Sequence, residues 1–430
     1  MKLPLPSRIG QILENKDYRR ILDNILSLFS LQGLNYILPL ITFPYLTRVL
    51  GPDKYGLVAF ALAFIGYFQI LTDYGFNMSA TREISIHRED EEKVSRIYSS
   101  VLTTKALLMV FSFLVMTVMV FSFDKFRTDW LLYYFSFLLV VGNLLLPTWF
   151  FQGMEKMRYI SILNIGISLI YTAAIFIFIR GSSDYLYVPL ISALGTIIIG
   201  IYSLRLVKRQ FGVSFKRPSR ADIQHQLEEG WHIFISTVAS SLYTITNTFI
   251  LGFFASPTIV GYYSVAEKIV RMVIGLMNPI SQAIYPYISS LAMKSKKEAT
   301  EFIKKVAIFM ATFTFIISLL LLLGAGPILI ILTGNQYLYS IPLLQIMSFL
   351  PFIIGLSNVF GVLFLFAFGH SNLVSRVQIT IGLCYPLMLI PMVYYMKDIG
   401  TALSFLIVEI VITLSFWKLY KNKVNEIKTC

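Results

Sequence analysis

The sequence is poor in charge and in cysteine. Only 14% of its 430 residues are charged and 56% are hydrophobic, whereas about a quarter of the residues of a typical soluble domain are charged. A soluble fold of this length could not keep so much apolar surface away from water, which excludes that class. The two cysteines, Cys384 and Cys430, provide neither a disulfide framework nor a metal-ligand spacing. We therefore expect a membrane protein without a cofactor.

Other patterns are missing as well. The sequence has no P-loop motif, so the chain is not by itself an ATP-driven pump. The four histidines are scattered, and no loop predicted on the outer side is long enough to hold a catalytic domain. We therefore expect a protein that is not an enzyme. Alternating strand patterns of about ten residues are also absent, which argues against an outer-membrane barrel.

Long uncharged runs are what the sequence has instead. Residues 25–46 and 306–339 contain no charged side chain, and a helix needs about 20 apolar residues to cross a bilayer core. We predict an all-α, polytopic membrane protein with about twelve transmembrane helices and a half-turn or re-entrant piece at the outer face near residues 327–332. The predicted spans are 25–46, 55–80, 100–122, 130–152, 159–179, 186–204, 231–253, 259–287, 303–323, 342–368, 377–396 and 399–417.

The lysines and arginines are distributed unevenly among the predicted loops. With both termini in the cytoplasm, 28 of the 36 fall in cytoplasmic segments and 6 in outer loops, and the other two lie within a span. Because cytoplasmic loops retain positive charge, this bias sets the orientation. We expect these basic loops to contact anionic lipids, so the net charge of +13 does not call for a nucleic-acid partner.

The longest basic loop lies in the middle of the chain. At an offset of 205 residues Pro52 aligns with Pro257 and Gly56 with Gly261, which indicates a repeat. Two six-helix pseudo-repeats predict a V-shaped transporter with alternating access to a site between its halves. The predicted parts are a cytoplasmic N-terminal segment (1–24), a six-helix bundle (25–205), a basic linker (206–230), a second six-helix bundle (231–417) and a cytoplasmic tail (418–430).

The main candidate site is Glu267-Lys268-Ile269-Val270-Arg271 in the eighth predicted span. Lys268 lies roughly 13 Å from the start of this span, at about 1.5 Å per residue, close to the middle of the bilayer. Charges at this depth are costly and usually face a cavity or a partner. Glu267 and Arg271 are four residues apart and can pair, which leaves a net positive stripe that could bind a phosphate. The alternative is a neutral structural pair beside a lysine that reaches toward the membrane surface.

Four other charged residues are candidates. Arg48, near the outer end of the first span, either lines the cavity or reaches the membrane interface. Asp73, at the inner end of the second span, is a coupling carboxylate, a gate or a helix contact, and Arg82 is one of its expected partners. Glu409 lies about ten residues into the last span. It is either a protonatable coupling group or a neutral glutamate that is hydrogen-bonded to a neighbour.

Several motifs resemble those of a known family. Together with the length and the span count, they make the chain similar to bacterial polysaccharide flippases, the O-antigen transporter group of the multidrug and polysaccharide exporter superfamily. The motifs are Phe-Pro-Tyr-Leu-Thr-Arg-Val-Leu-Gly-Pro at 43–52, Thr-Asp-Tyr-Gly-Phe at 72–76, Pro-Thr-Trp-Phe-Phe-Gln-Gly-Met-Glu-Lys-Met at 147–157 and Val-Gly-Tyr-Tyr-Ser-Val-Ala-Glu-Lys at 260–268.

The resemblance implies a function and a location. Such a protein moves an oligosaccharide unit on undecaprenyl pyrophosphate from the inner to the outer leaflet of the bacterial cytoplasmic membrane. A polysaccharide polymerase and the chain-length machinery then use the unit, so these proteins are possible partners. The resemblance also implies that a basic residue of span eight, here Lys268, lines a cationic cavity. Arg271 and Arg48 correspond less closely to the family pattern. We expect the protein to act as a monomer.

Two rival functions stay open. A cation-coupled multidrug exporter of the same superfamily would need a net acidic cavity, whereas the charges in span eight are net basic. A membrane polymerase or glycosyltransferase would need a large outer loop or an acidic catalytic set, and the sequence has neither. The identity of the glycan and of any coupling ion does not follow from the residues.

Overall fold

The chain is helical throughout the part that the structure, a computed structural model, describes. The backbone is described for residues 16–429 and the side chains for residues 37–427. Residues 1–15 of the predicted N-terminal segment therefore lie outside the described part. The helices of the first half are α2 (Lys16–Asp73), α3 (Phe76–His87), α4 (Glu91–Ser122), α5 (Asp124–Arg127), α6 (Trp130–Leu145), α7 (Thr148–Gly153), α8 (Met157–Phe178), η1 (Ser182–Leu186) and α9 (Tyr187–Phe211).

The second half begins with a long helix that follows the basic loop. Its helices are α10 (Arg220–Thr244), α11 (Thr246–Phe254), α12 (Pro257–Gly275), α13 (Asn278–Lys294), α14 (Lys296–Thr333), η2 (Asn335–Ser340), α15 (Ile341–Met347), α16 (Leu350–Asn358), η3 (Val359–Phe366) and α17 (Ser371–Thr429). Helix η3 is a π-helix, and α17 continues through most of the predicted tail.

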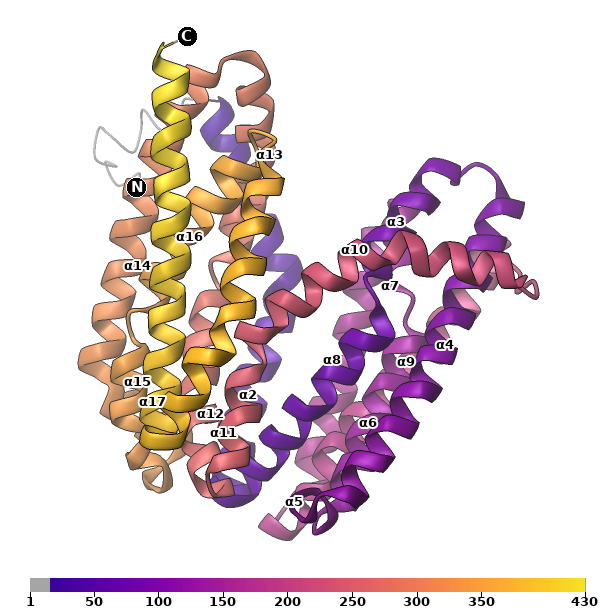
Figure 1. The fold of residues 1–430 in the computed structure, drawn as a ribbon, viewed down its shortest axis with the longest axis vertical. Helices are drawn as coiled ribbons and strands as arrows, with labels where there is room; N and C mark the ends of the chain where they lie inside the picture. The colour runs from indigo at the N-terminus through magenta and orange to yellow at the C-terminus, as the bar shows by residue number, and fades with distance from the viewer. Residues whose placement is uncertain (1–15, 430) are drawn as a thin grey trace, which may run out of the picture.

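Eight helical segments among the described residues are long and apolar enough to cross a membrane, and the pair α10–α11, bent by 52°, would make a ninth. Two of the eight, Ile37–His87 and Ser371–Ile427, are 51 and 57 residues long. Each reverses direction at one non-helical residue, Gly51 or Lys397 (Figure 1). Gly51 has a φ of 67°, which glycine adopts without steric cost. The chain is thus an all-helical, polytopic membrane protein.

The predicted half-turn and the eighth predicted span differ from the structure. The half-turn predicted near residues 327–332 is wrong, because α14 continues through Pro327 to Thr333. A proline can lie within a helix of a membrane protein when neighbouring elements satisfy the freed carbonyl group. The eighth predicted span is broken after Gly275 into α12 and α13. This break separates the charged part of the span from a part that is rich in amides.

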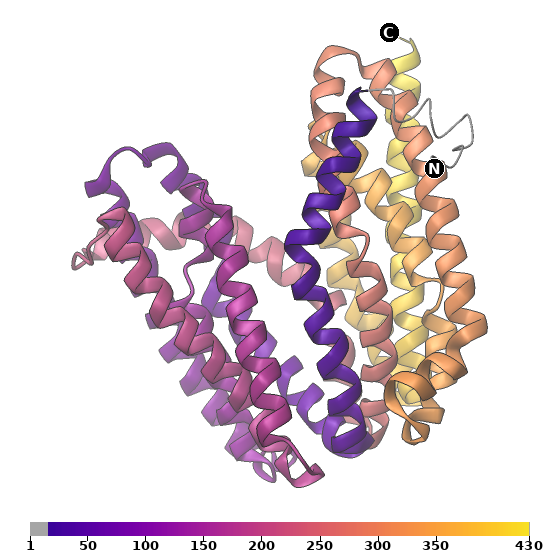
Figure 2. The ribbon, with the colours of Figure 1, turned by 180° about the vertical axis from the view of Figure 1, so that it is seen from behind.

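The helices form two lobes that meet at one end and diverge at the other (Figure 1). The first half of α2 runs along the C-terminal lobe, whereas its second half enters the N-terminal lobe after the turn at Gly51 (Figure 2). Helix α10 crosses between the lobes. Tyr74 of the N-terminal lobe stacks on Phe234 at a ring distance of 4.6 Å. The predicted boundary at residue 231 therefore falls inside a helix that contacts both lobes.

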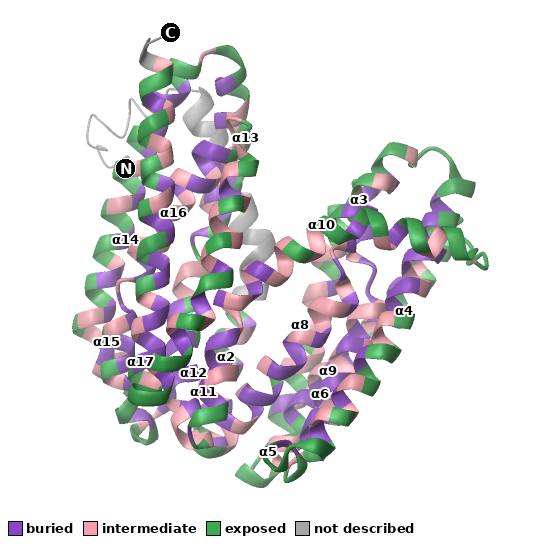
Figure 3. Ribbon diagram, viewed as in Figure 1, coloured by how far each residue is buried: buried purple, intermediate pink, exposed green. Residues whose placement is uncertain are grey.

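The outer faces of the lobes are apolar. On α4 the exposed large side chains recur every three or four residues, which places them on one helix face. A similar set covers α14, and Figure 3 shows exposed residues along the outer sides of both helices. Apolar surfaces of this extent face lipid and not water. The residues on α4 are Leu107, Phe111, Leu114, Val118 and Phe121.

The lobes meet through a reciprocal contact at what we call the closed end. A methyl group on Gly56 would lie 1.8 Å from the carbonyl oxygen of Pro257, and one on Gly261 would lie 2.0 Å from that of Pro52. Both positions therefore require glycine. The four residues are the two pairs that align at an offset of 205, so each half makes the same contact with the other. Two repeats related by a two-fold axis would contact each other in this way.

Aromatic rings and one lysine complete the closed end. Phe60 of α2 stacks on Phe249 of α11 at 5.8 Å and meets Phe253 edge-on at 6.0 Å. From α5, Lys125 donates hydrogen bonds to the carbonyl oxygens of Phe253 at 3.1 Å and Ala255 at 3.3 Å. A cation near carbonyl groups at a helix C-terminus is stabilising. The opening between the lobes therefore lies at the opposite end.

Candidate functional site

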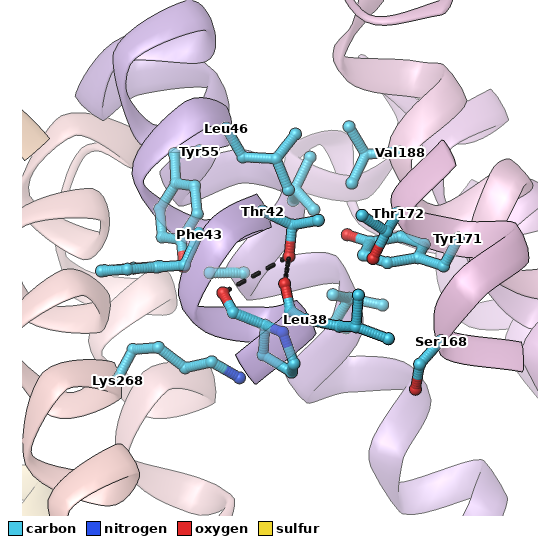
Figure 4. Close-up of a pocket in the computed structure, with 14 residues that line it drawn as sticks. Leu38, Thr42, Phe43, Leu46, Tyr55, Ser168, Tyr171, Thr172, Val188 and Lys268 are labelled. Carbon is cyan, nitrogen blue, oxygen red and sulfur yellow. Dashed lines mark hydrogen bonds between the residues drawn. The ribbon is translucent and has the colours of Figure 1, made fainter. Parts of the chain in front are cut away.

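Lys268 lies on α12 where the lobes face each other. It is exposed, although the residues on both sides of it are buried. It lines a cavity of about 280 Å³ together with Leu38 and Thr42 of α2. Figure 4 shows its side chain extending toward Leu38, with Ser168, Tyr171 and Thr172 of α8 on the far side of this cavity. The cavity therefore joins α2, the N-terminal lobe and the C-terminal lobe.

A second cavity of about 280 Å³ lies on the other side of Lys268. Arg271 and Met272 also line it, and Pro39 of α2 borders both cavities. Among residues 37–427, no hydrogen bond or ion pair engages the Lys268 amine. A lysine in this position can donate up to three hydrogen bonds to a ligand that enters either cavity.

The sequence of α12 explains why these side chains are presented. Pro257 at the start of the helix has the φ angle that a first turn needs and leaves no orphan N–H. One face of the helix, which includes Val260, Ser264 and Glu267, is buried, whereas Lys268 and Arg271 are exposed on another face. The two exposed cations are three residues apart and are therefore neighbours on the helix surface.

Glu267 and Arg271 form the predicted pair. Arg271 donates from Nε at 2.9 Å and from Nη2 at 2.6 Å to Glu267 Oε1. Nη2 also donates to the carbonyl oxygen of Thr244 at 2.7 Å, and Thr248 donates to Glu267 Oε2 at 3.2 Å. The buried carboxylate is thus neutralised within the C-terminal lobe. The positive charge of Lys268 is therefore left over from this pair.

Glu409 lies close to this pair. It is 8% exposed on α17, one turn beyond Phe405, whose ring centroid lies 5.4 Å from the Arg271 guanidinium carbon. The structure therefore brings four of the predicted residues, Glu267, Lys268, Arg271 and Glu409, into one region of the C-terminal lobe.

The other three predicted residues lie elsewhere. Arg48 is at the closed end, where its Nη2 donates to the carbonyl oxygen of Ile331 near the end of α14 at 2.5 Å. Arg82 is exposed on α3 at the open end of the N-terminal lobe (Figure 1). Asp73 accepts a hydrogen bond from Lys105, at 2.7 Å between Oδ1 and Nζ. Lys105 lies on α4 and is buried inside the lobe.

Sequence reasoning missed the hydroxyl groups opposite Lys268. Ser168 and Thr172 lie on one face of α8, four residues apart, and Tyr171 lies between them. Each is an ordinary residue within an apolar run, so no spacing or charge distinguishes it. Lys105 did carry a signal, since it is a charged residue five positions inside a predicted span.

The geometry supports anion binding between the lobes. An ammonium group without a protein partner and a partly exposed guanidinium face two cavities, and hydroxyl groups line the opposite wall. Phosphate oxygens accept hydrogen bonds from such groups. A cationic ligand would meet the unpaired ammonium group of Lys268 in the same place.

Comparison with known proteins identifies the family. Residues 21–292 match the polysaccharide biosynthesis protein family. The chain is 34% identical to the "Putative O-antigen transporter" of Escherichia coli (strain K12), over 95% of this chain and 98% of that one.

Solved structures share the fold. An inward-facing multidrug resistance MATE family transporter of the MOP superfamily superposes with a TM-score of 0.74 at 15% identity, over 91% of this chain and 96% of that one. The lipid II flippase MurJ in its inward closed conformation superposes with a TM-score of 0.67 at 16% identity, over 92% and 87%. The fold is common to all three chains, and the family match covers more than half of this one. The protein belongs to the polysaccharide biosynthesis protein family.

Proposed function

We propose that this protein is a flippase that moves oligosaccharide units linked to undecaprenyl pyrophosphate from the inner to the outer leaflet of the bacterial cytoplasmic membrane. One observation carries the proposal. Lys268, in the middle of a predicted membrane span, lines two cavities between the lobes and has no protein partner among the described residues. An intramembrane charge without a partner is costly unless a ligand or water uses it. The pyrophosphate of a lipid carrier is such a ligand, and relatives of this chain are O-antigen transporters by description.

The proposed architecture is a pair of six-helix repeats that cross the membrane twelve times in total. Helices α2 and α17 each cross twice, because both reverse at the closed end, and the broken pairs α10–α11 and α12–α13 each cross once. The basic loops place the termini in the cytoplasm. The lobes diverge at the end that carries the C-terminus (Figure 1), so this conformation opens inward.

In the proposed cycle the inward opening admits the pyrophosphate to Lys268. Arg271 contributes its Nη1 donors, since Nε and Nη2 are engaged by Glu267 and Thr244. The glycan occupies the hydrated space between the lobes, and the prenyl tail remains in lipid. Separation of the Gly56–Pro257 and Gly261–Pro52 contacts then opens the outer side. A polymerase and the chain-length machinery would receive the unit there.

Of the two coupling candidates, Glu409 is the better placed. Asp73 is engaged by Lys105 in the N-terminal lobe, far along the chain from the cationic site. Glu409 is buried beside Phe405 and Arg271, so protonation there would change the charge balance next to the bound anion. The coupling ion would be a proton or sodium.

The rival function is a multidrug exporter, because some proteins with this fold carry that description. Similarity at 15% identity shows only the fold. A cationic drug would be repelled by the unpaired positive charge of Lys268 between the lobes. The cavity charge therefore favours the anionic lipid-linked substrate.

Complementation tests the proposal. In a flippase-null strain that makes the cognate glycan, the wild-type protein should restore surface polysaccharide, and Lys268→Ala should restore only a small part of it. Lys268→Arg should retain activity because the charge is kept. Lys294→Ala, at an exposed lysine near the end of α13, is the matched control, and all variants are compared at equal membrane abundance. Full activity of Lys268→Ala would contradict the cationic site, and no rescue by the wild type would contradict the flippase function.

A further inference from the structure

A polar stripe continues from the cationic site along the next helix. Lys268 and Arg271 lie three residues apart on one face of α12. They are followed on α13 by Asn278, Gln282 and Tyr285, whose steps of four and three residues keep them on one face of that helix. The first four are exposed and Tyr285 is half-buried. The charged part of the stripe thus leads into a neutral, amide-rich part toward the open end (Figure 1).

The amides line a recess of about 510 Å³. Its wall consists of Asn278, Ser281, Gln282, Tyr285, Asn358, Val362 and Phe366. Ser281 donates to Asn358 Oδ1 at 2.8 Å, which orients this carboxamide. None of the described lining residues is charged. Recesses of this size, with a few polar groups among apolar ones, are typical of small-ligand sites.

The other wall of the recess is an unusual helix. Val362 and Phe366 lie on η3, an eight-residue π-helix that follows Asn358. Turns of this type are rare and occur frequently at functional sites, because the extra residue per turn displaces neighbouring side chains. The π-helix is thus a second indication of function at the same place, independent of the polar stripe.

We propose that this recess binds the distal sugars of the lipid-linked oligosaccharide. This inference rests on the proposed flippase function. Carboxamides donate to and accept from sugar hydroxyl groups, and the rings of Tyr285 and Phe366 provide flat apolar faces for a pyranose. A phosphate would lack a cation there. Gln282 follows Lys268 by 14 residues across two consecutive helices, which is at most roughly 20 Å at about 1.5 Å per residue. The recess would therefore contact sugars that are distant from the pyrophosphate.

Isosteric substitutions separate sugar binding from a prenyl-tail site. The double variant Asn278→Leu, Gln282→Met keeps the shape of the recess but removes its hydrogen bonds, which an apolar tail would tolerate. Two lost hydrogen bonds to sugar hydroxyls should lower transport of the complete unit about tenfold. Ser290→Ala, an exposed residue of α13 outside the recess, is the matched control and should transport like the wild type.

The assay uses two hosts that lack their own flippase. One makes the complete cognate unit, and the other stops synthesis after the first sugar. In both, the fraction of lipid-linked glycan on the outer face is measured at equal protein abundance. We expect the double variant to fail with the complete unit and to move the one-sugar carrier like the wild type.

Each other outcome has a separate meaning. Normal transport of the complete unit by the double variant would overturn the recess and leave the flippase function standing. Equal losses of transport with the complete unit and with the one-sugar carrier would also overturn the proposed recess, because it would then not bind distal sugars. Failure of the wild type with its cognate glycan would overturn the proposed function and the recess that rests on it.

Discussion

The closed end should not tolerate a methyl group at Gly261. An added Cβ would lie 2.0 Å from the carbonyl oxygen of Pro52, whereas real contacts essentially never fall below 3.0 Å. The lobes must therefore separate locally by about 1 Å or more in Gly261→Ala. Overpacking of this kind costs about 1–3 kcal/mol. The cost falls only on the state in which the closed end is shut, so the equilibrium should shift about 5- to 150-fold toward the outward-open state.

Cysteine labelling measures this shift. Phe249 of α11 packs on Phe60 and Phe64 of α2 while the end is shut, so a cysteine at residue 249 reports its opening. The two native cysteines are first replaced by serine. A membrane-impermeant maleimide added to intact cells should label Phe249→Cys at least about fivefold faster when Gly261→Ala is also present. Gly56→Ala should act in the same way, because its Cβ would lie 1.8 Å from the Pro257 oxygen.

A matched glycine controls for helix propensity and expression. A methyl group on Gly326 of α14 would lie an ordinary 3.8 Å from Ile341 Cδ1, its nearest neighbour outside the backbone of its own helix. Gly326→Ala should therefore label like the parent. Equal labelling of the Gly261→Ala and parent proteins at equal abundance would refute the reasoning. It would mean that the lobes do not separate at this contact or that the contact is not shut in the resting protein.

Three further predictions concern the charged residues. Asp73→Ala removes the carboxylate that pairs with Lys105, whose side chain is 3% exposed. The folded state should therefore lose about 3 kcal/mol of stability, seen as a smaller fraction of monodisperse protein after heating. The double variant Asp73→Ala, Lys105→Met should recover most of this stability. Glu267→Gln removes the carboxylate that pairs with Arg271, whose side chain is 41% exposed. The loss of folding stability should be smaller than in Asp73→Ala, about 1–2 kcal/mol, and is measured as a lower Tm. Lys125→Ala removes both hydrogen bonds to the end of α11. The maleimide should therefore label Phe249→Cys faster when Lys125→Ala is also present.

Different results would contradict these predictions. A double variant at Asp73 and Lys105 as unstable as Asp73→Ala would show that lost packing, and not an unpaired charge, causes the defect. An unchanged Tm in Glu267→Gln would mean that the Arg271 guanidinium finds equivalent partners in Thr244 and water. Labelling of Lys125→Ala at the parent rate would show that the two hydrogen bonds from Lys125 do not stabilise the closed end.

The sequence alone determined the properties that depend on local composition and spacing. Apolar runs predicted helices that cross a membrane, because a helix satisfies the hydrogen bonds of its own backbone within lipid. The charge bias also predicts an orientation, with the basic loops in the cytoplasm. The spacing of Glu267 and Arg271 predicted their ion pair, since side chains four residues apart are neighbours on any helix. The offset of 205 residues also marked Gly56 and Gly261 as equivalent positions before their contact was known.

The tertiary structure decided which distant residues meet. Asp73 pairs with Lys105 and not with Arg82, because the packing of α2 on α4 sets that distance. Arg48 was expected either to line the cavity or to reach the membrane interface. In the structure it contacts the end of α14 and is not among the residues that line the two cavities. Asn358 reaches the α13 amides only through the packing of α16 and η3. Spacing within a helix is set by its backbone, whereas contacts between helices depend on the packing of the whole chain, which no short pattern contains.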